Sequence, residues 1–418
     1  MKQSKKENYH HSNKLNIISK LLTISIIVIF IIFIYSAIKY KKSIDKPNFA
    51  LTENTFSDEN MMSSTISDEV QKSSTINMAF TGDIMCHNTI YNDAHSSSGN
   101  YDFSHIFEDV KSYLQTPDIT IGNLETTLAG SSKGYSSYPT FNTPESLAYN
   151  LKDVGFDVVS TANNHCYDSG YSGIESTINY LDDADISHTG TYKSEEEQNK
   201  ILIKNVNGIN IAFLSFTYGT NGIPVPSNKS YSVNLIDKEL ILKQLSLAEE
   251  QNPDLICISM HWGNEYQTSS NSNQEELADF LFKNGADIII GNHPHVLQNM
   301  EKREITLDDG STKDGFVIYS LGNFLADQNK TYTRNSVILN LNITKNSEGK
   351  ISINSVTYTP IYTYKDKAKS SQKFKIIDLE KAISNYEMEN DTTYGASVYN
   401  TFKTELDNIK NLIGEEIH

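Results

Sequence analysis

The stretch VVSTANNHCYDSG, residues 158–170, joins a short β-branched apolar run to a cluster of polar side chains. Taken alone, Asn163, Asn164 and His165 fit either a turn that ends a strand or the rim of a site, because Asn is common in turns. The pattern recurs in five other apolar runs, which end in polar clusters at residues 81–83, 122–125, 261–263, 291–295 and 322–324. Helix-like spans lie between several of these runs, at residues 144–154, 171–184, 235–250 and 273–284. Alternating strands and helices predict an α/β fold.

Two further segments indicate that the sheets are mixed. Asn207-Gly208 separates two alternating runs, which is a strong signal for a β-hairpin. Residues 335–364 have the pattern of a second antiparallel pair. From about Ile376 the pattern becomes helical. We therefore expect a layered α/β sandwich over residues 76–362 and a C-terminal helical extension over residues 363–418.

The N-terminal region has a different character. Residues 21–38 carry no charge and, with their flanks, are long enough to cross a hydrocarbon core of about 30 Å. No small-residue cleavage site follows, so we interpret this run as an uncleaved signal anchor. Residues 1–20 are then cytoplasmic, and residues 39–75 form a Ser/Thr/Asn/Asp-rich stalk. The expected localisation is the cell membrane, with one span and an extracellular C-terminal domain.

Charge and cysteine content exclude some partners and frameworks. Residues 1–46 carry a net charge of +7. The whole chain carries −17, so residues 47–418 carry −24. Nucleic acid is therefore not an expected partner, because binding to phosphates requires a basic surface. Cys86, Cys166 and Cys257 are the three cysteines, too few for a disulfide framework.

The strand ends together carry a set of side chains suited to metal binding. In an open α/β sheet the ligand crevice lies beyond the carboxyl ends of the strands. Carboxylate, amide and imidazole groups are ligands for Mn, Fe and Zn. The candidates in chain order are Asp83, Asn123, Glu125, Asn164, His165, His261, His293 and His295.

Each candidate also has a simpler interpretation. Asp83 could cap a helix, Asn123 and Asn164 could form turns, and His261 could be a packed core residue. The metal site would be absent only if every one of these simpler interpretations held at once, at several strand ends. Four tyrosines in neighbouring loops are candidates to line a groove: Tyr91, Tyr101, Tyr138 and Tyr218.

At this point a family resemblance becomes specific. The motifs TGDIM, GNLET, ANNH, MHWG, GNHPHV and YSLGNF, in this order over about residues 77–327, resemble the CapA family of poly-γ-glutamate capsule synthesis proteins. That family is a branch of the calcineurin-like metallophosphoesterase superfamily. The resemblance implies a four-layer αββα sandwich with a dinuclear centre of Mn, Fe or Zn at its strand ends.

The resemblance also implies roles for individual residues. His165 resembles the histidine that protonates the leaving group, and Glu125, or as the alternative Asn123, stands in the place of the bridging carboxylate. Met85 stands where the superfamily has a histidine ligand, and His87 is a candidate substitute. The implied metal ligands are Asp83, Glu125, Asn164, His261, His293 and His295, and the possible supporting residues are Asn123, Asn163, His87 and Asn323.

Three functions remain open from the sequence. The first is a membrane-anchored, metal-dependent hydrolase or transferase in the synthesis, export or anchoring of an anionic capsular polymer such as poly-γ-glutamate, working with other capsule-synthesis membrane proteins. The second is a metallophosphoesterase that acts on another envelope phosphoester. The third is a non-catalytic, metal-stabilised scaffold.

Overall fold

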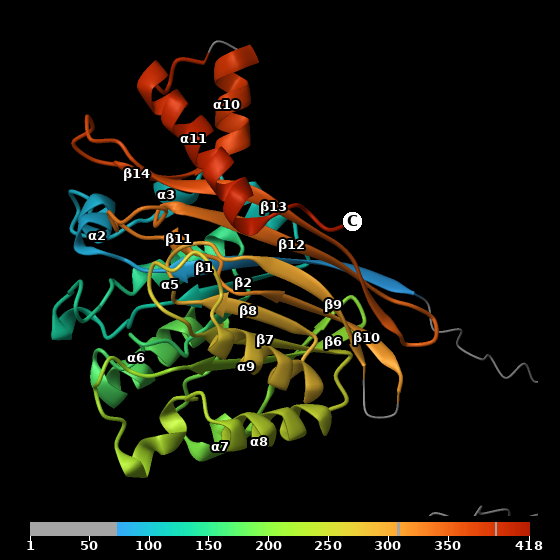
Figure 1. The fold of residues 1–418 in the computed structure, drawn as a ribbon. Helices are drawn as coiled ribbons and strands as arrows, with labels where there is room; N and C mark the ends of the chain where they lie inside the picture. The colour runs from blue at the N-terminus through green and yellow to red at the C-terminus, as the bar shows by residue number, and fades with distance from the viewer. Residues whose placement is uncertain (1–72, 307–309, 389–390) are drawn as a thin grey trace, which may run out of the picture. The chain divides into compact units, whose positions relative to one another are not determined.

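The computed structural model describes residues 73–306, 310–388 and 391–418. Two mixed β-sheets lie face to face in this part of the chain (Figure 1). The first sheet has the strand order β14 (Phe374–Asp378), β13 (Ile351–Lys365), β12 (Asn335–Lys345), β1 (Ser74–Ile84), β2 (Ile119–Leu124), β3 (Val158–Ser160) and β4 (Ser187–Thr189). The second has the order β5 (Leu202–Val206), β6 (Ile209–Thr217), β7 (Leu255–His261), β8 (Ile288–Asn292), β10 (Thr312–Ile318) and β9 (Met300–Thr306).

Strand direction divides each sheet. Strands β1 to β4 are parallel to one another, whereas β12, β13 and β14 are antiparallel additions. In the second sheet β6, β7, β8 and β10 are parallel, and β5 and β9 are antiparallel at the two edges. The predicted hairpin is confirmed, because Asn207 and Gly208 join β5 to β6 with positive φ angles of 49° and 88°.

Apolar side chains explain the layering. Phe80, Ile121 and Val158 of the first sheet share one core cluster with Phe213 and Ile290 of the second sheet. Alternate residues of the same strands face outward, as strand geometry requires. The outer face of the first sheet is covered by α2 (Asn88–Ala94), α3 (Ser104–Phe107), α4 (Lys111–Gln115), α5 (Ser146–Val154) and α6 (Gly170–Asp183). The outer face of the second sheet is covered by α8 (Lys238–Glu249) and α9 (Ser272–Lys283). The result is the helix–sheet–sheet–helix layering that was predicted.

The C-terminal segment completes the first sheet before it becomes helical. β14 occupies Phe374–Asp378, so the helix expected from about Ile376 begins instead at Leu379. The apolar side chains of this stretch alternate between the faces of the sheet, with Ile376 and Ile377 in different clusters. Helices α10 (Leu379–Met388) and α11 (Ala396–Ile413) follow and pack on β12 and β13. The short helix α7 (Glu195–Asn199) precedes β5.

A short strand joins the two sheets beside the strand ends. After β10 in the second sheet the chain crosses to the first, where β11 (Asn323–Leu325) pairs with β1. Gly82 allows this approach, since a Cβ at that position would lie 1.9 Å from the Gly322 carbonyl oxygen. Asn323 is thereby placed opposite Asp83 in the register.

Within the described residues no helix is both long enough and apolar enough to cross a bilayer. The predicted anchor at residues 21–38 lies outside those residues, as does nearly all of the predicted stalk. The predicted domain boundaries stay a prediction.

Candidate metal centre

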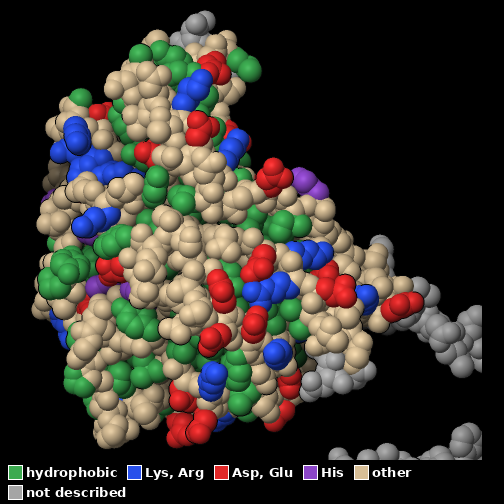
Figure 2. Space-filling view, viewed as in Figure 1, with side chains coloured by type: hydrophobic (Ala, Val, Ile, Leu, Met, Phe, Trp, Pro, Cys, Tyr) green, Lys and Arg blue, Asp and Glu red, His purple; other side chains and the backbone are tan. Residues whose placement is uncertain are grey.

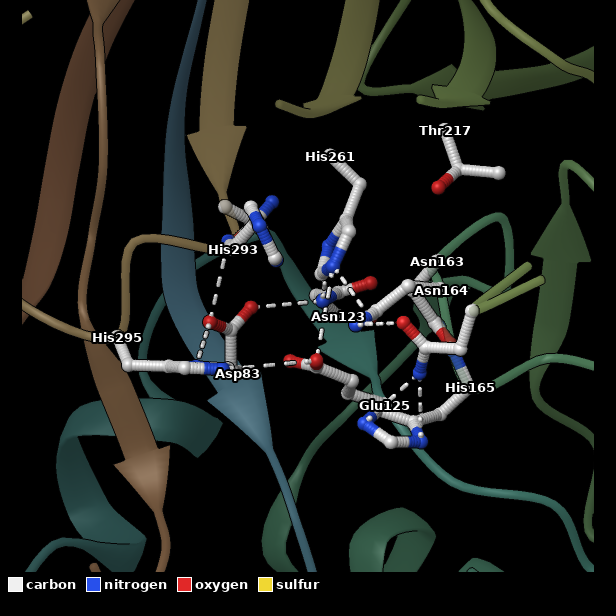
Figure 3. A network of polar contacts seen from close by, with 12 residues as sticks. Asp83, Asn123, Glu125, Asn163, Asn164, His165, Thr217, His261, His293 and His295 are labelled. Carbon is white, nitrogen blue, oxygen red and sulfur yellow. Dashed lines mark hydrogen bonds and ion pairs between the residues drawn. The ribbon is translucent and has the colours of Figure 1, made fainter. Parts of the chain in front are cut away.

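Parallel strands bring the polar clusters together at one edge of the molecule. β1, β2 and β3 of the first sheet and β7 and β8 of the second all end there, and Asp83, Asn123 and His261 at these ends point toward one another (Figure 3). Asp83 and Asn123 are neighbours in the register of β1 and β2, and His261 and Asn292 are neighbours in β7 and β8. The structure places all of the predicted ligand residues in this buried region: Asp83, Glu125, Asn164, His261, His293 and His295.

Two groups of side chains have the spacing of metal ligands. Within Asp83, Glu125 and His295 the potential ligand atoms all lie within 4.8 Å of one another. The same holds for Glu125, His261 and His293. Glu125 belongs to both groups, so a single carboxylate lies between two candidate positions for an ion.

Buried polar atoms that lack a hydrogen bond indicate whether a cation fits this site. Both carboxylate oxygens of Glu125 and Nδ1 of His293 are buried, and none of the three forms a hydrogen bond. Such atoms cost about 1–3 kcal/mol each when they stay unpaired, and more when the group is charged. A divalent ion in each group would satisfy all three, and carboxylate and imidazole are donors that Mn, Fe and Zn accept.

Hydrogen bonds fix the candidate ligands in place. Asn123 donates to Oδ1 of Asp83 at 2.7 Å and accepts from the Ser160 hydroxyl at 2.7 Å, so it orients the carboxylate. Nδ1 of His295 lies 3.1 Å from Oδ2 of Asp83 and 3.0 Å from Oδ1 of Asn323. These contacts leave Nε2 of His295 directed toward Glu125, at 3.9 Å from Oε1.

The turn after β8 is unusual in its backbone. His293 and His295 have φ angles of 98° and 59°, values that a residue with a Cβ rarely adopts. The backbone N–H of His293 donates to Oδ2 of Asp83 at 3.2 Å, which ties the turn to β1. Strained residues of this kind are concentrated at functional sites. Here the strain directs two imidazoles toward the same carboxylates.

Burial and mutual charge shift the ionisation of the cluster. Burial raises the pKa of Glu125 well above its usual value, and the adjacent Asp83 carboxylate raises it further. Burial lowers the pKa of His261 to about 3 and that of His293 to about 2, which keeps both imidazoles neutral. Burial also opposes protonation of His295, but the Glu125 and Asp83 carboxylates outweigh it and raise its pKa to about 9. The two carboxylates, beside the neutral imidazoles of His261 and His293, form an environment suited to a cation.

Residues 77–328 match the family described as bacterial capsule synthesis protein PGA_cap. The chain belongs to this family. The resemblance to the CapA proteins that the sequence motifs predicted is confirmed.

Two relatives in the PGA_cap family have printed names that refer to the capsule. The chain is 31% identical over 278 residues to the capsule biosynthesis protein CapA of Bacillus anthracis, covering 65% of this chain and 64% of the relative. It is 30% identical over 323 residues to the PGA biosynthesis protein CapA of Bacillus subtilis, covering 76% and 80%. Among solved structures, the NAD nucleotidase of Haemophilus influenzae aligns with a TM-score of 0.44 and 14% identity, covering 83% of this chain and 65% of that one.

Met85 supplies no metal ligand in this PGA_cap protein. Met85 is buried in a small apolar cluster with Phe141 and Ala326. His87, the candidate substitute, is in neither ligand group of the described residues. Its Nδ1 accepts a hydrogen bond from the backbone N–H of Asp327 at 3.2 Å, and its ring contacts Phe141 edge-on.

In the segment that follows β3, Asn163 and Asn164 make different contacts. Oδ1 of Asn164 lies 2.9 Å from Nε2 of His261, so the amide reaches the second ligand group. Asn163 donates to the Leu124 carbonyl at 2.8 Å and accepts from the backbone N–H of His165 at 3.1 Å. Asn163 therefore positions the loop, and the ligand role of Asn164 stays a prediction.

Sequence reasoning missed Asp168. Its Oδ2 lies 2.7 Å from Nδ1 of His165, and the same oxygen accepts from the backbone N–H of Phe141 at 2.6 Å. A carboxylate three residues after a histidine in a tight turn was an available signal. This contact fixes the imidazole, whose Nε2 lies 3.5 Å from Nδ2 of Asn221.

Aromatic side chains rim the centre. Tyr218 and Tyr266 are partly exposed and lie 4.6 Å and 6.2 Å, between ring centroids, from His293 and His295 respectively. Tyr218 was a predicted groove residue, and Tyr266 was missed. Tyr91 and Tyr101 instead contact each other on the outer face of the first sheet.

Proposed function

We propose that this chain is a metal-dependent hydrolase or transferase of the cell envelope that acts on an anionic capsular polymer such as poly-γ-glutamate. The observation that carries the proposal is the shared carboxylate of Glu125 between two ligand groups, beside a histidine held by an aspartate. Membership in the PGA_cap family and the names of the Bacillus relatives support the polymer. An N-terminal membrane anchor and other capsule-synthesis membrane proteins as partners belong to the same proposal.

Two sets of side chains would each hold one ion. Asp83, Glu125 and His295 would hold one ion, and the second would be held by Glu125 together with Asn164, His261 and His293. Divalent ions, when bound, supply an activated water nucleophile and polarise the oxygen of the electrophile.

His165 carries the proton transfer in this proposal. With Nδ1 held by Asp168, the imidazole can present a proton at Nε2 to the departing group. Nδ2 of Asn221 lies 3.5 Å from Nε2 of His165, and Oδ1 of Asn221 accepts from Nδ2 of Asn164 at 3.1 Å. The proton donor is thus connected to the second ligand group through one side chain.

A phosphoester of the envelope is the second candidate substrate. The same ligand set and proton donor suit phosphoryl transfer, in which catalysis consists mainly of positioning and charge stabilisation. A non-catalytic scaffold would retain the ions and need no proton donor.

The deciding experiment compares wild type, His165→Ala and Asp168→Asn in the purified full-length chain. We expect about two transition-metal ions per chain in all three. The length of poly-γ-glutamate, followed by size-exclusion chromatography, should fall with wild type. The rate should be about 100-fold or more lower with His165→Ala and about 10–100-fold lower with Asp168→Asn.

Other outcomes would assign another function. Cleavage of a chromogenic phosphodiester but not of the polymer would favour the phosphoesterase. Full metal content with no activity on either substrate would favour the scaffold, and absence of transition metal would refute all three.

A further inference from the structure

Lys and Arg side chains gather near the metal centre on two loops that lie far apart in the sequence. The β11–β12 loop carries Lys330 and Arg334, and the end of β13 with the β13–β14 loop carries Lys365, Lys367, Lys369 and Lys373. We call these six residues the basic ridge. Figure 2 shows Lys and Arg gathered on the same side of the molecule as the loop that leads into β14 in Figure 1.

The ridge opposes the charge of the rest of the chain. Residues 327–334 and 365–373 hold six basic and two acidic residues, a net charge of +4, whereas residues 47–418 as a whole carry −24. Clustered charge of one sign creates a local field that concentrates ligands of the opposite sign. The ridge is therefore a distinct electrostatic region and does not follow from the average composition.

Most of this positive charge is not neutralised by neighbours. The side chain of Asp327 is 6% exposed and accepts from both Arg334, at 2.7 Å, and Lys365, so one carboxylate serves two cations. The ammonium groups of Lys330, Lys367, Lys369 and Lys373 form no ion pair with any carboxylate of the described residues. Lys330, Lys367 and Lys369 are exposed.

Two chains of contacts connect the ridge to the metal centre. Nζ of Lys330 lies 5.8 Å from the ring centroid of Tyr266, and that ring lies 6.2 Å from the ring of His295. On the other route Asp327, which holds Arg334 and Lys365, donates its backbone N–H to His87 beside the centre. Contacts therefore run from the ridge to the centre through Tyr266 and through Asp327.

From this placement we propose that the basic ridge is the docking surface for an extended polycarboxylate chain, which it delivers to the metal centre past Tyr266. The inference rests on the proposed function for the identity of the polymer. Lysine ammonium groups on long flexible stems suit a flexible chain of repeated carboxylates, since each can pair without a fixed geometry. Docking of this kind weakens as salt screens the charges.

The test is a binding measurement on the full-length chain, with fluorescently labelled poly-γ-glutamate of defined length as the probe. Lys367→Glu combined with Lys369→Glu should weaken binding about tenfold or more at low salt, and Lys330→Glu should weaken it by a smaller factor. The matched control is Lys243→Glu combined with Lys350→Glu, which reverses the charge of two exposed lysines outside the ridge. The control should stay within about twofold of wild type.

The outcomes separate this inference from the proposed function. Equal binding by the ridge variant and wild type would overturn the ridge, and so would an equal loss in the control. Tighter binding of polyphosphate than of poly-γ-glutamate would overturn the polycarboxylate as its occupant. A ridge variant that retains its metal and still cleaves a small chromogenic substrate would attribute the loss to docking. Binding by the ridge in a chain that holds no metal would instead refute the proposed function alone.

Discussion

The first sheet has two halves that differ in strand direction and in what their ends carry. β1, β2 and β3 are parallel, and their ends bring Asp83, Asn123 and Glu125 into contact with imidazoles from the second sheet. β12, β13 and β14 are antiparallel, so their carboxyl ends alternate between the two edges. Their inward face packs on α10 and α11 through apolar side chains such as Val356 and Phe402.

The comparison shows how strand direction assigns a role to a segment. Parallel strands end on the same edge, so one polar residue after each is enough to build a site from distant parts of the chain. Antiparallel strands give no such convergence. On the β12–β14 half, α10 and α11 cover the same face that the second sheet covers on β1, β2 and β3. That half is expected to set stability, and the parallel half to set metal binding.

Glu125→Gln should have the largest effect, because it removes the carboxylate that both ligand groups share. We expect the metal content to fall from about two ions per chain to background, and activity to fall more than about 100-fold. Elemental analysis of the purified chain measures the first quantity. Glu380→Gln on α10, whose carboxylate pairs with Lys410 at 2.8 Å, is the matched control in the antiparallel half. Retention of both ions in Glu125→Gln would contradict the shared role.

Phe402→Ala should have the opposite effect to Glu125→Gln, because it should lower stability and leave metal binding unchanged. Phe402 is 1% exposed and contacts the rings of Tyr362, Tyr364 and Tyr394, so its removal leaves a cavity. The free energy of unfolding should fall by about 3–5 kcal/mol in a urea titration. Metal content of the folded chain should not change.

Met388→Ala is the control for this cavity, since that side chain is 79% exposed. It should leave the unfolding midpoint almost where it is in wild type. A loss of metal from folded Phe402→Ala would show that the two halves are coupled.

A smaller effect on the free energy of unfolding is expected when the pH is lowered. Burial lowers the pKa of His87 from 6.5 to about 4, so the folded chain keeps this imidazole neutral where the unfolded chain protonates it. The corresponding stability is present above pH 6.5 and is lost as pH falls toward 4, by about 3 kcal/mol. His87→Asn should flatten the fall in unfolding free energy over this range, and His418→Asn, at an exposed terminus, should not. An unchanged slope in His87→Asn would contradict the assignment.

The layering and the convergence of the site could be predicted from the sequence because they depend on period and strand order. Each polar cluster followed an apolar run, and the parallel order then determined where Asp83, Asn164 and His261 would meet. β14 was missed because residues 376–378 have a pattern compatible with either a helix or a strand, and pairing with β13 decided between them.

Other features depend on contacts that local sequence does not determine. Tyr266 reaches the rim only because the β7–α9 loop folds back, with its backbone N–H donating to the Pro294 carbonyl at 2.8 Å. The basic ridge combines loops more than thirty residues apart, which β12 and β13 bring together. Asp168 is the exception, because its spacing from His165 was visible in the sequence.

The short strand β11 has a kinetic consequence. The backbone N–H groups of Asp83 and Met85 donate to the carbonyls of Gly322 and Leu325, at 2.9 Å and 2.7 Å. The peptide that supplies these carbonyls comes directly from the second sheet. These two amides can therefore exchange with deuterium only when β11 separates from β1, so they report that local opening. An ion held between Asp83 of β1 and His295, which follows β8, would join the two sheets beside this strand and should slow the exchange of the same amides.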